Sequence, residues 1–320
     1  MQGPILVTGA AGFAGSHVVE TLAGSGETVG LIHRTGPPHE IASLARWERL
    51  DLLDAGSVRD AIARIRPSAV IHCAGAPNVA QSWRDPTTPL SHNVLATHHL
   101  FDALRRVGSP CRVVVAGSAT VYATSSEPLT EHSAVAPSNP YAVSKLAQEQ
   151  LSLRAAREDG VEVVVTRSFN HTGPRQSAAF AAPNMARQIA LIEQGLVEPV
   201  IKIGNLDAQR DFTDVRDTAR AYVLLLTRGI TESVYNICSG VARSMRSVLD
   251  ALAARSTVDL LIETDPALLR PSDTPILLGD STKLRTDTGW QPEIPFERTL
   301  DDLLNYWRRT TREQAGTGHC

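Results

Sequence analysis

Short apolar runs rich in β-branched residues alternate with longer segments rich in Ala, Leu and Arg along the first half of the chain. Such runs predict strands, and the longer segments predict the helices between them. Strands are expected at residues 5–8, 28–32, 69–73, 112–116 and 161–166, and helices at 14–23, 57–65, 90–106 and 140–158. Because parallel strands need crossover helices of right-handed sense, the alternation predicts an α/β fold with a doubly wound parallel sheet.

The alternation loosens after Phe169, where Pro174, Pro183 and Pro199 interrupt helical stretches. We expect a smaller C-terminal lobe to begin here. Residues 211–227 again have the pattern of a short extended piece and a helix, and residues 233–238 that of a strand, so this part of the chain can return to the sheet. The expected division is a cofactor-binding domain of residues 1–168 plus about 209–236, interleaved with a substrate lobe of about 169–208 and 237–320.

Charge and composition exclude several function classes. The 320 residues carry 31 basic and 34 acidic side chains, a net charge of −3, and no run of adjacent basic residues is longer than a pair. There is no basic tract of the kind that binds nucleic acid or an anionic membrane, so neither is expected as a partner. The first residues lack an export signal and no later segment approaches membrane-spanning length, so we expect a cytoplasmic protein.

The cysteines and histidines predict neither disulfides nor a metal site. Cys73, Cys111, Cys238 and Cys320 are widely spaced without a C-x-x-C pair, as in reduced cytoplasmic proteins. The ten histidines are scattered, without the H-E-x-x-H spacing or the nearby cysteine pair that would hold a metal ion. We expect no bound metal.

Three glycines lie between the first predicted strand and the first predicted helix. Gly9, Gly12 and Gly15 belong to the segment TGAAGFAG, residues 8–15. In a Rossmann-type sheet, such a loop brings a dinucleotide pyrophosphate to a helix N-terminus: the first glycine permits the tight turn, the second the close approach of the phosphates, and the third the packing of helix on strand. The position of the loop predicts a dinucleotide cofactor, bound by these glycines and by Phe13 among them.

The residues after the second strand indicate which dinucleotide binds. Sheets that bind NAD carry an acid here for the ribose hydroxyls, whereas this chain has His33-Arg34-Thr35. The Arg34 guanidinium suits the additional phosphate of NADP, so NADP (NADPH) is expected rather than NAD. The alternative for Arg34 is a solvated loop arginine. Asp51 and Leu52 follow the next short strand, where they either contact the adenine or, with equal support, Asp51 only caps a turn.

A serine, a tyrosine and a lysine indicate redox chemistry. Tyr141 and Lys145 are one turn apart on a predicted helix, with Asn139 as its N-cap and Pro140 at its first position. A phenol holds its proton to a pKa of about 10, and a neighbouring ammonium lowers that pKa, so the pair can move a proton near neutral pH. Tyrosine and lysine at this spacing also occur by chance. Together with the glycine loop and with Ser118 after the fourth predicted strand, they predict redox chemistry on a carbonyl or an alcohol.

The glycine loop, the serine and Tyr-x-x-x-Lys resemble the extended short-chain dehydrogenase/reductase family, and the likeness covers nearly the whole chain. Further matching segments are VIHCAG (70–75), NVLAT (93–97), SATVY (118–122), FNHTGP (169–174), GNLDAQRDF (204–212) and RPSD (270–273). The last two are narrower signals. They are similar to the branch that handles GDP-mannose derivatives, which contains GDP-mannose 4,6-dehydratases and GDP-6-deoxy-4-keto-mannose reductases.

The resemblance implies a role for each matching residue. Tyr141 donates its proton to a sugar keto oxygen, Lys145 holds the nicotinamide ribose and lowers the Tyr141 pKa, and Ser118 hydrogen-bonds the reacting oxygen. Ala74 joins the cofactor-binding residues. The nucleotide sugar is bound by Asn170, Asn205, Arg210, Arg270 and Asp273. The two arginines among these suit its diphosphate, with an ordinary surface ion pair as the alternative for either one.

The resemblance also bears on helix support and on oligomeric state. Asn93 lies inside a predicted helix, where it is expected to support the active-site helix by hydrogen bonding rather than to contact substrate. Similar proteins pair helices such as 90–106 and 140–158 across a dimer, so the resemblance implies a homodimer.

Two positions beside Ser118 separate the reactions of the family. Dehydratases carry a Ser or Asp followed by Glu there, an acid that expels the C6 hydroxyl, whereas this chain has Ala119-Thr120. We therefore expect NADPH-dependent reduction of a GDP-4-keto-6-deoxyhexose, from GDP-6-deoxy-4-keto-D-mannose to GDP-D-rhamnose or its C4 epimer. The alternatives, in order, are a nucleotide-sugar 4-epimerase, in which Ala-Thr is common at these positions, a GDP-mannose 4,6-dehydratase, and a non-catalytic NADP-binding sensor.

Overall fold

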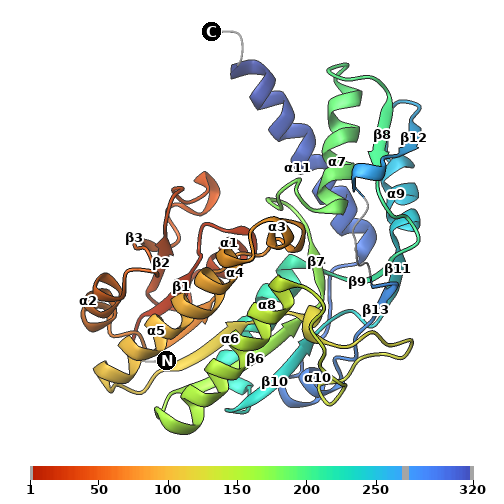
Figure 1. Ribbon diagram of the computed structural model, residues 1–320. Helices are drawn as coiled ribbons and strands as arrows, with labels where there is room; N and C mark the ends of the chain where they lie inside the picture. The colour runs from red at the N-terminus through yellow and green to blue at the C-terminus, as the bar shows by residue number, and fades with distance from the viewer. Residues whose placement is uncertain (1–2, 269–273, 318–320) are drawn as a thin grey trace.

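The larger of the two lobes is built on a sheet of seven parallel strands. In the computed structural model, which describes residues 3–268 and 274–317, their order is β10-β6-β5-β4-β1-β2-β3 (Figure 1). The strands are β1 (Ile5–Thr8), β2 (Thr28–Ile32), β3 (Arg46–Arg49), β4 (Ala69–His72), β5 (Arg112–Ala116), β6 (Glu162–Ser168) and β10 (Ser233–Ile237). The order turns back between β1 and β4, which confirms the predicted α/β fold with a Rossmann-type, doubly wound sheet.

Helices cover both faces of this sheet because the apolar side chains of each strand alternate between the faces. On β1, Ile5 and Val7 belong to one buried cluster and Leu6 belongs to the other. Helices α1 (Phe13–Thr21), α8 (Val215–Arg228) and α10 (Thr282–Thr288) pack on the first cluster, and α2 (Ala55–Ile65), α5 (Ala96–Val107) and α6 (Pro140–Glu158) pack on the second. Burial on two sides explains why β1, β2, β4, β5 and β6 are largely apolar runs in the sequence, whereas the edge strand β3 is polar and partly exposed.

The single helix expected at residues 90–106 is a π-helix followed by an α-helix. Leu90–Leu95 form the π-helix η2, and α5 begins only at Ala96. Two short helices that the sequence pattern does not predict, α3 (Val79–Arg84) and α4 (Thr87–Pro89), precede it. A π-helix admits an extra residue into the turn. Within η2 the buried Asn93 bonds the backbone N–H and C=O of Ala76, a long-range contact that the local pattern does not encode.

The smaller lobe packs helices against short strands. Its helices are α7 (Ala181–Glu193), α9 (Met245–Ala253) and α11 (Phe296–Thr317), joined by a third buried cluster. Strand β9 (Gln209–Asp214) pairs with β7 (Asn170–Thr172), β11 (Ala242–Ser244) and β13 (Ile276–Leu277), while β8 (Val200–Ile203) pairs with β12 (Leu261–Thr264). Three 3-10 turns complete the described chain: η1 (His39–Ile41), η3 (Ala119–Val121) and η4 (Pro266–Leu268). Among the described helices, none is long and apolar enough to cross a membrane.

The chain crosses between the lobes repeatedly, so the lobes are interleaved as expected. After β9 in the small sheet, α8 and β10 pack on the large sheet, β11 and α9 return to the small lobe, and α10 goes back to the large one (Figure 1). The residue bounds expected for the two domains stay a prediction.

A half-buried arginine ties the loop after β7 to α1. The Arg175 guanidinium donates to both carboxylate oxygens of Glu20, at 2.9 and 2.6 Å, and to Ser16 Oγ at 3.1 Å. Burial raises the pKa of Glu20, but hydrogen bonds from His17 and Arg175 outweigh it and lower the value to about 2. Glu20 is therefore ionised at neutral pH, and this ion pair holds the loop against the helix that opens the cofactor site.

Candidate active site

One cavity of about 890 Å³ lies between the carboxyl ends of the large sheet and the small lobe. Twelve of the predicted site residues line it: Gly9, Gly12, Phe13, Gly15, Arg34, Ala74, Ser118, Tyr141, Lys145, Asn170, Asn205 and Arg210. Among the described residues, Asp51 and Leu52 do not line it. Arg270 and Asp273 lie outside the described residues. The fold thus gathers side chains that are far apart in the sequence, while their individual roles stay predictions.

The glycine loop forms a cradle that side chains would fill. Gly9 has a φ of 64°, and a Cβ there would lie 2.8 Å from the Ala74 backbone. A Cβ on Gly15 would lie 2.2 Å from the Gly9 carbonyl oxygen. Gly12 is the N-cap of α1 and offers no side-chain acceptor, so the N–H groups of the first helical turn face the cavity. These features fit a bound pyrophosphate.

Substituting Gly15 by Ala is expected to destabilise the cofactor cradle. The added methyl must push α1 away from the loop that follows β1, so we expect a loss of about 1–3 kcal/mol in unfolding free energy and weaker NADPH binding. Thermal denaturation and fluorescence titration with NADPH measure the two effects. Gly36→Ala is the matched control, because a Cβ added at Gly36 would meet no other atom within 4 Å. Equal stability and affinity in both variants would contradict the cradle.

The loop after β2 is held by a second arginine. Arg49 Nη1 donates to the carbonyl oxygens of His33 and Arg34 at 3.0 and 3.3 Å, which leaves the exposed Arg34 side chain at the cavity edge. Asp51 accepts a hydrogen bond from Leu53 N at 2.9 Å and lies 3.5 Å from His33 Nε2. The turn-capping role considered for Asp51 is thus present, and its contact with adenine stays a prediction.

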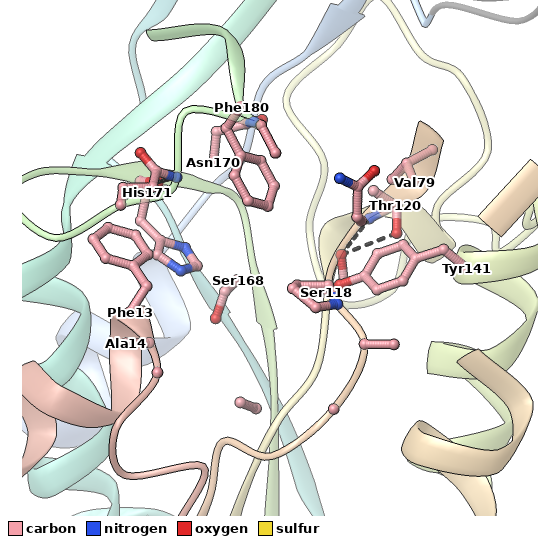
Figure 2. Close-up of a pocket in the computed structure, with 18 of the residues that line it drawn as sticks. Phe13, Ala14, Val79, Ser118, Thr120, Tyr141, Ser168, Asn170, His171 and Phe180 are labelled. Carbon is pink, nitrogen blue, oxygen red and sulfur yellow. Dashed lines mark hydrogen bonds between the residues drawn. The ribbon is translucent and has the colours of Figure 1, made fainter. Parts of the chain in front are cut away.

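Ser118, Thr120 and Tyr141 lie together on one side of the cavity (Figure 2). Ser118 Oγ is 2.9 Å from Thr120 Oγ1 and accepts a hydrogen bond from Thr120 N at 3.3 Å. The position of Tyr141 follows from α6, which begins as expected with Pro140 after Asn139, whose Oδ1 caps Ala142 N at 2.9 Å. Three hydroxyl groups from two segments therefore border one space.

The Tyr141 pKa shifts in the direction opposite to the one expected. Burial raises the pKa of the phenol, and a hydrogen bond with Ser118 only partly offsets this. The lowering expected from Lys145 does not prevail over burial. The Lys145 ammonium donates to Ala116 O and to Gln148 Oε1, each at 2.5 Å. Burial lowers the Lys145 pKa to about 8. At neutral pH the pair therefore carries a protonated phenol and a protonated amine.

Aromatic side chains line the opposite side, and of these the sequence singled out Phe13 but not His171 or Phe180. The Phe13 and His171 rings are stacked with centroids 5.7 Å apart and planes at 10°, and Figure 2 shows Asn170 and Phe180 near them. Burial lowers the His171 pKa, so this ring is neutral. The segment FNHTGP includes His171, but only the folded structure shows that its ring stacks on Phe13.

Two predicted sugar-nucleotide residues are positioned by the small lobe. Arg210 Nη1 donates to Gln209 O at 2.8 Å and to Thr274 O at 2.7 Å. Asn205 Oδ1 accepts a hydrogen bond from Asp207 N at 2.9 Å. Both side chains line the cavity, and their contact with a ligand stays a prediction.

Asn93 has the supporting contacts expected for it. Its Nδ2 donates to Ser144 Oγ on α6 at 2.9 Å, and its Oδ1 accepts from Ala76 N at 2.8 Å. The side chain is fully buried. It therefore joins η2, the loop after β4 and the helix that carries Tyr141.

Comparisons with known proteins agree with this arrangement. Residues 6–303 match the family model described as GDP-mannose 4,6 dehydratase. The GDP-6-deoxy-D-mannose reductase of Pseudomonas aeruginosa is 37% identical over 313 residues, which cover 97% of this chain and 99% of that protein. The GDP-mannose 4,6-dehydratase of Vibrio cholerae serotype O1 is 25% identical over 344 residues, 93% of this chain and 92% of that one.

Among solved structures, the Pseudomonas aeruginosa protein RMD in complex with NADPH aligns with a TM-score of 0.84 and 35% identity, covering 97% of this chain and 100% of that one. The Pseudomonas aeruginosa reductase and the RMD structure each match 97% of the chain, so the likeness extends over both lobes. The expected resemblance to extended short-chain dehydrogenases/reductases is confirmed, and with it an enzyme of that type. The chain belongs to the GDP-mannose 4,6-dehydratase family.

Proposed function

We propose that this protein uses NADPH to reduce the 4-keto group of GDP-6-deoxy-4-keto-D-mannose, giving GDP-D-rhamnose or its C4 epimer. The relative of 37% identity, a GDP-6-deoxy-D-mannose reductase, and the likeness to an NADPH complex support this. One observation carries the choice of reaction within the family. The neighbour of Ser118 is the Thr120 hydroxyl, 2.9 Å away, where elimination of water would need an acid.

The described side chains supply proton transfer and orientation. NADPH, when bound, supplies the hydride for the keto carbon. Tyr141 holds its proton at neutral pH, because burial raises its pKa, and donates it to the oxygen as negative charge develops there. Ser118 hydrogen-bonds the same oxygen, and the charged Lys145 stabilises that charge from behind. A tyrosine kept protonated suits a reductase, in which the phenol acts as an acid.

Threonine opposes dehydration but is compatible with epimerisation. A hydroxyl such as that of Thr120 has no proton acidic enough to expel the C6 hydroxyl, so the dehydratase alternative has no acid in this position. An epimerase recycles one bound cofactor, whereas a reductase releases NADP⁺ after each turnover. A sensor needs neither the phenol nor the ammonium at the cavity.

Cofactor consumption separates these functions. The protein is mixed with NADPH and GDP-6-deoxy-4-keto-D-mannose, and the loss of NADPH absorbance is followed with time. A reductase consumes NADPH in proportion to added substrate, over many turnovers of the enzyme. NADPH that binds but is not consumed would reject the reductase assignment and leave the epimerase and the sensor. Of these two, only the epimerase would interconvert GDP-sugars without net use of cofactor.

Replacing Arg34 by Ala is expected to reduce the preference for NADPH over NADH by roughly 10- to 100-fold, because a charge-assisted hydrogen bond to phosphate is lost. The kcat/KM for NADPH falls and that for NADH stays, since NADH has no such phosphate. Arg46→Ala is the matched control: this exposed arginine pairs with Glu27 and Glu48 on the sheet edge. An unchanged cofactor ratio in Arg34→Ala would place the phosphate elsewhere.

The other half of the substrate is assigned to the small lobe. We propose that Asn170, Asn205, Arg210, Arg270 and Asp273 bind the GDP part. The cavity lining by the first three supports this assignment. Guanidinium groups suit the diphosphate, and crystals soaked with GDP-, UDP- and dTDP-sugars would identify the preferred base from the atoms beside Asn205.

We also propose a homodimer through the α5–α6 side of the sheet. Large apolar side chains are exposed on neighbouring elements there: Trp83, Leu90, Leu95 and Val143 are 45, 48, 44 and 47% exposed. Because η2 and α3 both pack beside α6, these residues belong to one face of the lobe. A mass of two chains by light scattering would support the dimer, and a single-chain mass at high concentration would reject it.

A further inference from the structure

A chain of buried polar side chains connects Lys145 to the first strand of the sheet. Lys145 Nζ donates to Gln148 Oε1 at 2.5 Å, and Gln148 Nε2 donates to Thr97 Oγ1 at 2.8 Å. Thr97 Oγ1 also lies 2.8 Å from His72 Nε2, whose Nδ1 is 2.7 Å from Thr8 Oγ1. Gln148, Thr97, His72 and Thr8 are all at most 1% exposed. The roles assigned to the active site use none of these four.

The direction of each hydrogen bond in this chain is determined. The Thr97 hydroxyl donates its one proton to Asn93 O at 2.6 Å, so its oxygen accepts from both Gln148 and His72. His72 therefore carries its proton on Nε2 and accepts at Nδ1 from Thr8, whose oxygen in turn accepts from Ala74 N at 3.1 Å. Burial lowers the His72 pKa to about 3, so the ring is neutral.

This bonding fixes the orientation of the Gln148 amide. Its NH₂ group donates to Thr97, so its carbonyl oxygen faces the Lys145 ammonium. In the flipped amide, the NH₂ group would face the ammonium, and two donors would meet without an acceptor. Two of the three ammonium hydrogens are thereby engaged, one by Gln148 and one by Ala116 O. The remaining hydrogen is left for the cavity side.

No ionised acid balances the Lys145 charge in the described part of the chain. The titratable groups that face it are His72 at the end of β4, Cys73 directly after that strand, and Tyr141 from its own helix, with Tyr222 of α8 beyond them. Burial raises the Cys73 pKa to about 12, and His72 is neutral, so neither is charged at neutral pH. The stabilisation of the buried ammonium therefore comes from the oxygens of Gln148 and Ala116.

We propose that Gln148 is a positioning residue for Lys145: held by Thr97 and the neutral His72, its amide oxygen keeps the ammonium charged and directed at the cavity. The proposal depends on the proposed reductase function only for the catalytic role of Lys145, not for the hydrogen bonds that hold its ammonium. The set of Thr8, His72, Thr97 and Gln148 acts through Lys145 and does not contact substrate.

Two substitutions at Gln148 are expected to move the pH dependence in opposite directions. Gln148→Leu removes a hydrogen bond to a charged group, so the pH above which kcat falls moves down by about one pH unit or more. Gln148→Glu places a carboxylate against the ammonium, so this high-pH limb of the kcat profile, the pH range in which kcat falls, moves to higher pH. Because Tyr141 and Lys145 titrate as a coupled pair, the pH of this limb cannot be assigned to one residue. The quantity compared is therefore its displacement between each variant and the wild type.

The matched control is Gln194→Leu, which breaks the same kind of bond, from an amide Nε2 to Thr311 Oγ1 at 2.6 Å, in the small lobe. It is expected to leave the limb in place. A second readout needs no sugar substrate: the pH at which NADPH affinity falls, followed by fluorescence, moves with each Gln148 variant in the same direction as the limb.

The outcomes separate the inference from the proposed function. If the pH profiles of NADPH affinity are displaced in the Gln148 variants but no reductase activity is found, the positioning role of Gln148 is supported and the reductase function is rejected. If Gln148→Leu fails to fold, Gln148→Glu and Thr97→Val still test the positioning role. Thr97→Val removes the hydroxyl that holds the Gln148 amide, so it is expected to move the high-pH limb to lower pH. Lower activity at every pH with profiles that coincide with the wild-type profile would overturn the positioning role.

Discussion

Replacing Tyr141 by Phe is expected to lower NADPH-dependent reduction of GDP-6-deoxy-4-keto-D-mannose by roughly 100- to 10,000-fold. The ring remains, so the cavity keeps its shape, but the proton for the keto oxygen is lost. Ser118 does not replace it, because a serine hydroxyl is a far weaker acid than a phenol, and its Oγ is bonded to Thr120 at 2.9 Å. The effect is expected in kcat, measured by NADPH absorbance under saturating substrate.

Cofactor binding by the Tyr141→Phe variant is expected to match the wild type, because the glycine cradle and Arg34 are untouched. Tyr235→Phe is the matched control. Tyr235 lies on the edge strand β10 and its hydroxyl donates to Asp287 Oδ2 of α10 at 2.7 Å, so its loss affects stability and leaves kcat unchanged. Retained turnover in Tyr141→Phe would show that another group protonates the sugar oxygen and would remove the central assumption of the mechanism.

The parts of the site that the sequence predicts are those that depend on local geometry. Spacing alone puts Tyr141 and Lys145 on one helix face, and Asn139-Pro140 indicates where that helix begins. Likewise, a glycine loop directly after a strand predicts the cradle, since both elements are adjacent in the chain. The central strands of the large sheet were predictable because burial on both faces makes them apolar runs, whereas the edge strand β3 has the polar sequence RWER.

The parts that escape prediction depend on contacts between distant segments. The raised Tyr141 pKa results from burial in the folded protein, and Lys145 bonds Ala116 and Gln148 instead of compensating for it. Gln148 is three residues from Lys145, but its role requires Thr97 from α5 and His72 from β4 at the same point. The π-helix η2 likewise forms where Asn93 meets Ala76.

One such long-range contact supports the catalytic helix and yields a large expected stability effect. Arg167 at the end of β6 is 6% exposed and Glu149 on α6 is 2% exposed. Their side chains form two parallel bonds, Nε to Oε2 at 2.9 Å and Nη2 to Oε1 at 2.6 Å, and the guanidinium lies 4.7 Å from the centre of the Tyr122 ring. Glu149 is one turn beyond Lys145, so this pair fixes α6 to the sheet.

Substituting Glu149 by Gln is expected to lower the unfolding free energy by about 3–5 kcal/mol, because the buried Arg167 charge loses its counter-ion. Urea denaturation measures the effect.

The matched control is Arg157→Ala, which breaks the exposed Arg157–Glu232 pair of 2.6 Å and is expected to cost less than about 1 kcal/mol. The double variant Arg167→Met/Glu149→Leu is expected to recover most of the loss, since it removes both charges and leaves apolar side chains of similar size. Equal losses in Glu149→Gln and Arg157→Ala would contradict the argument that burial, rather than the number of ion pairs, makes this contact important for α6.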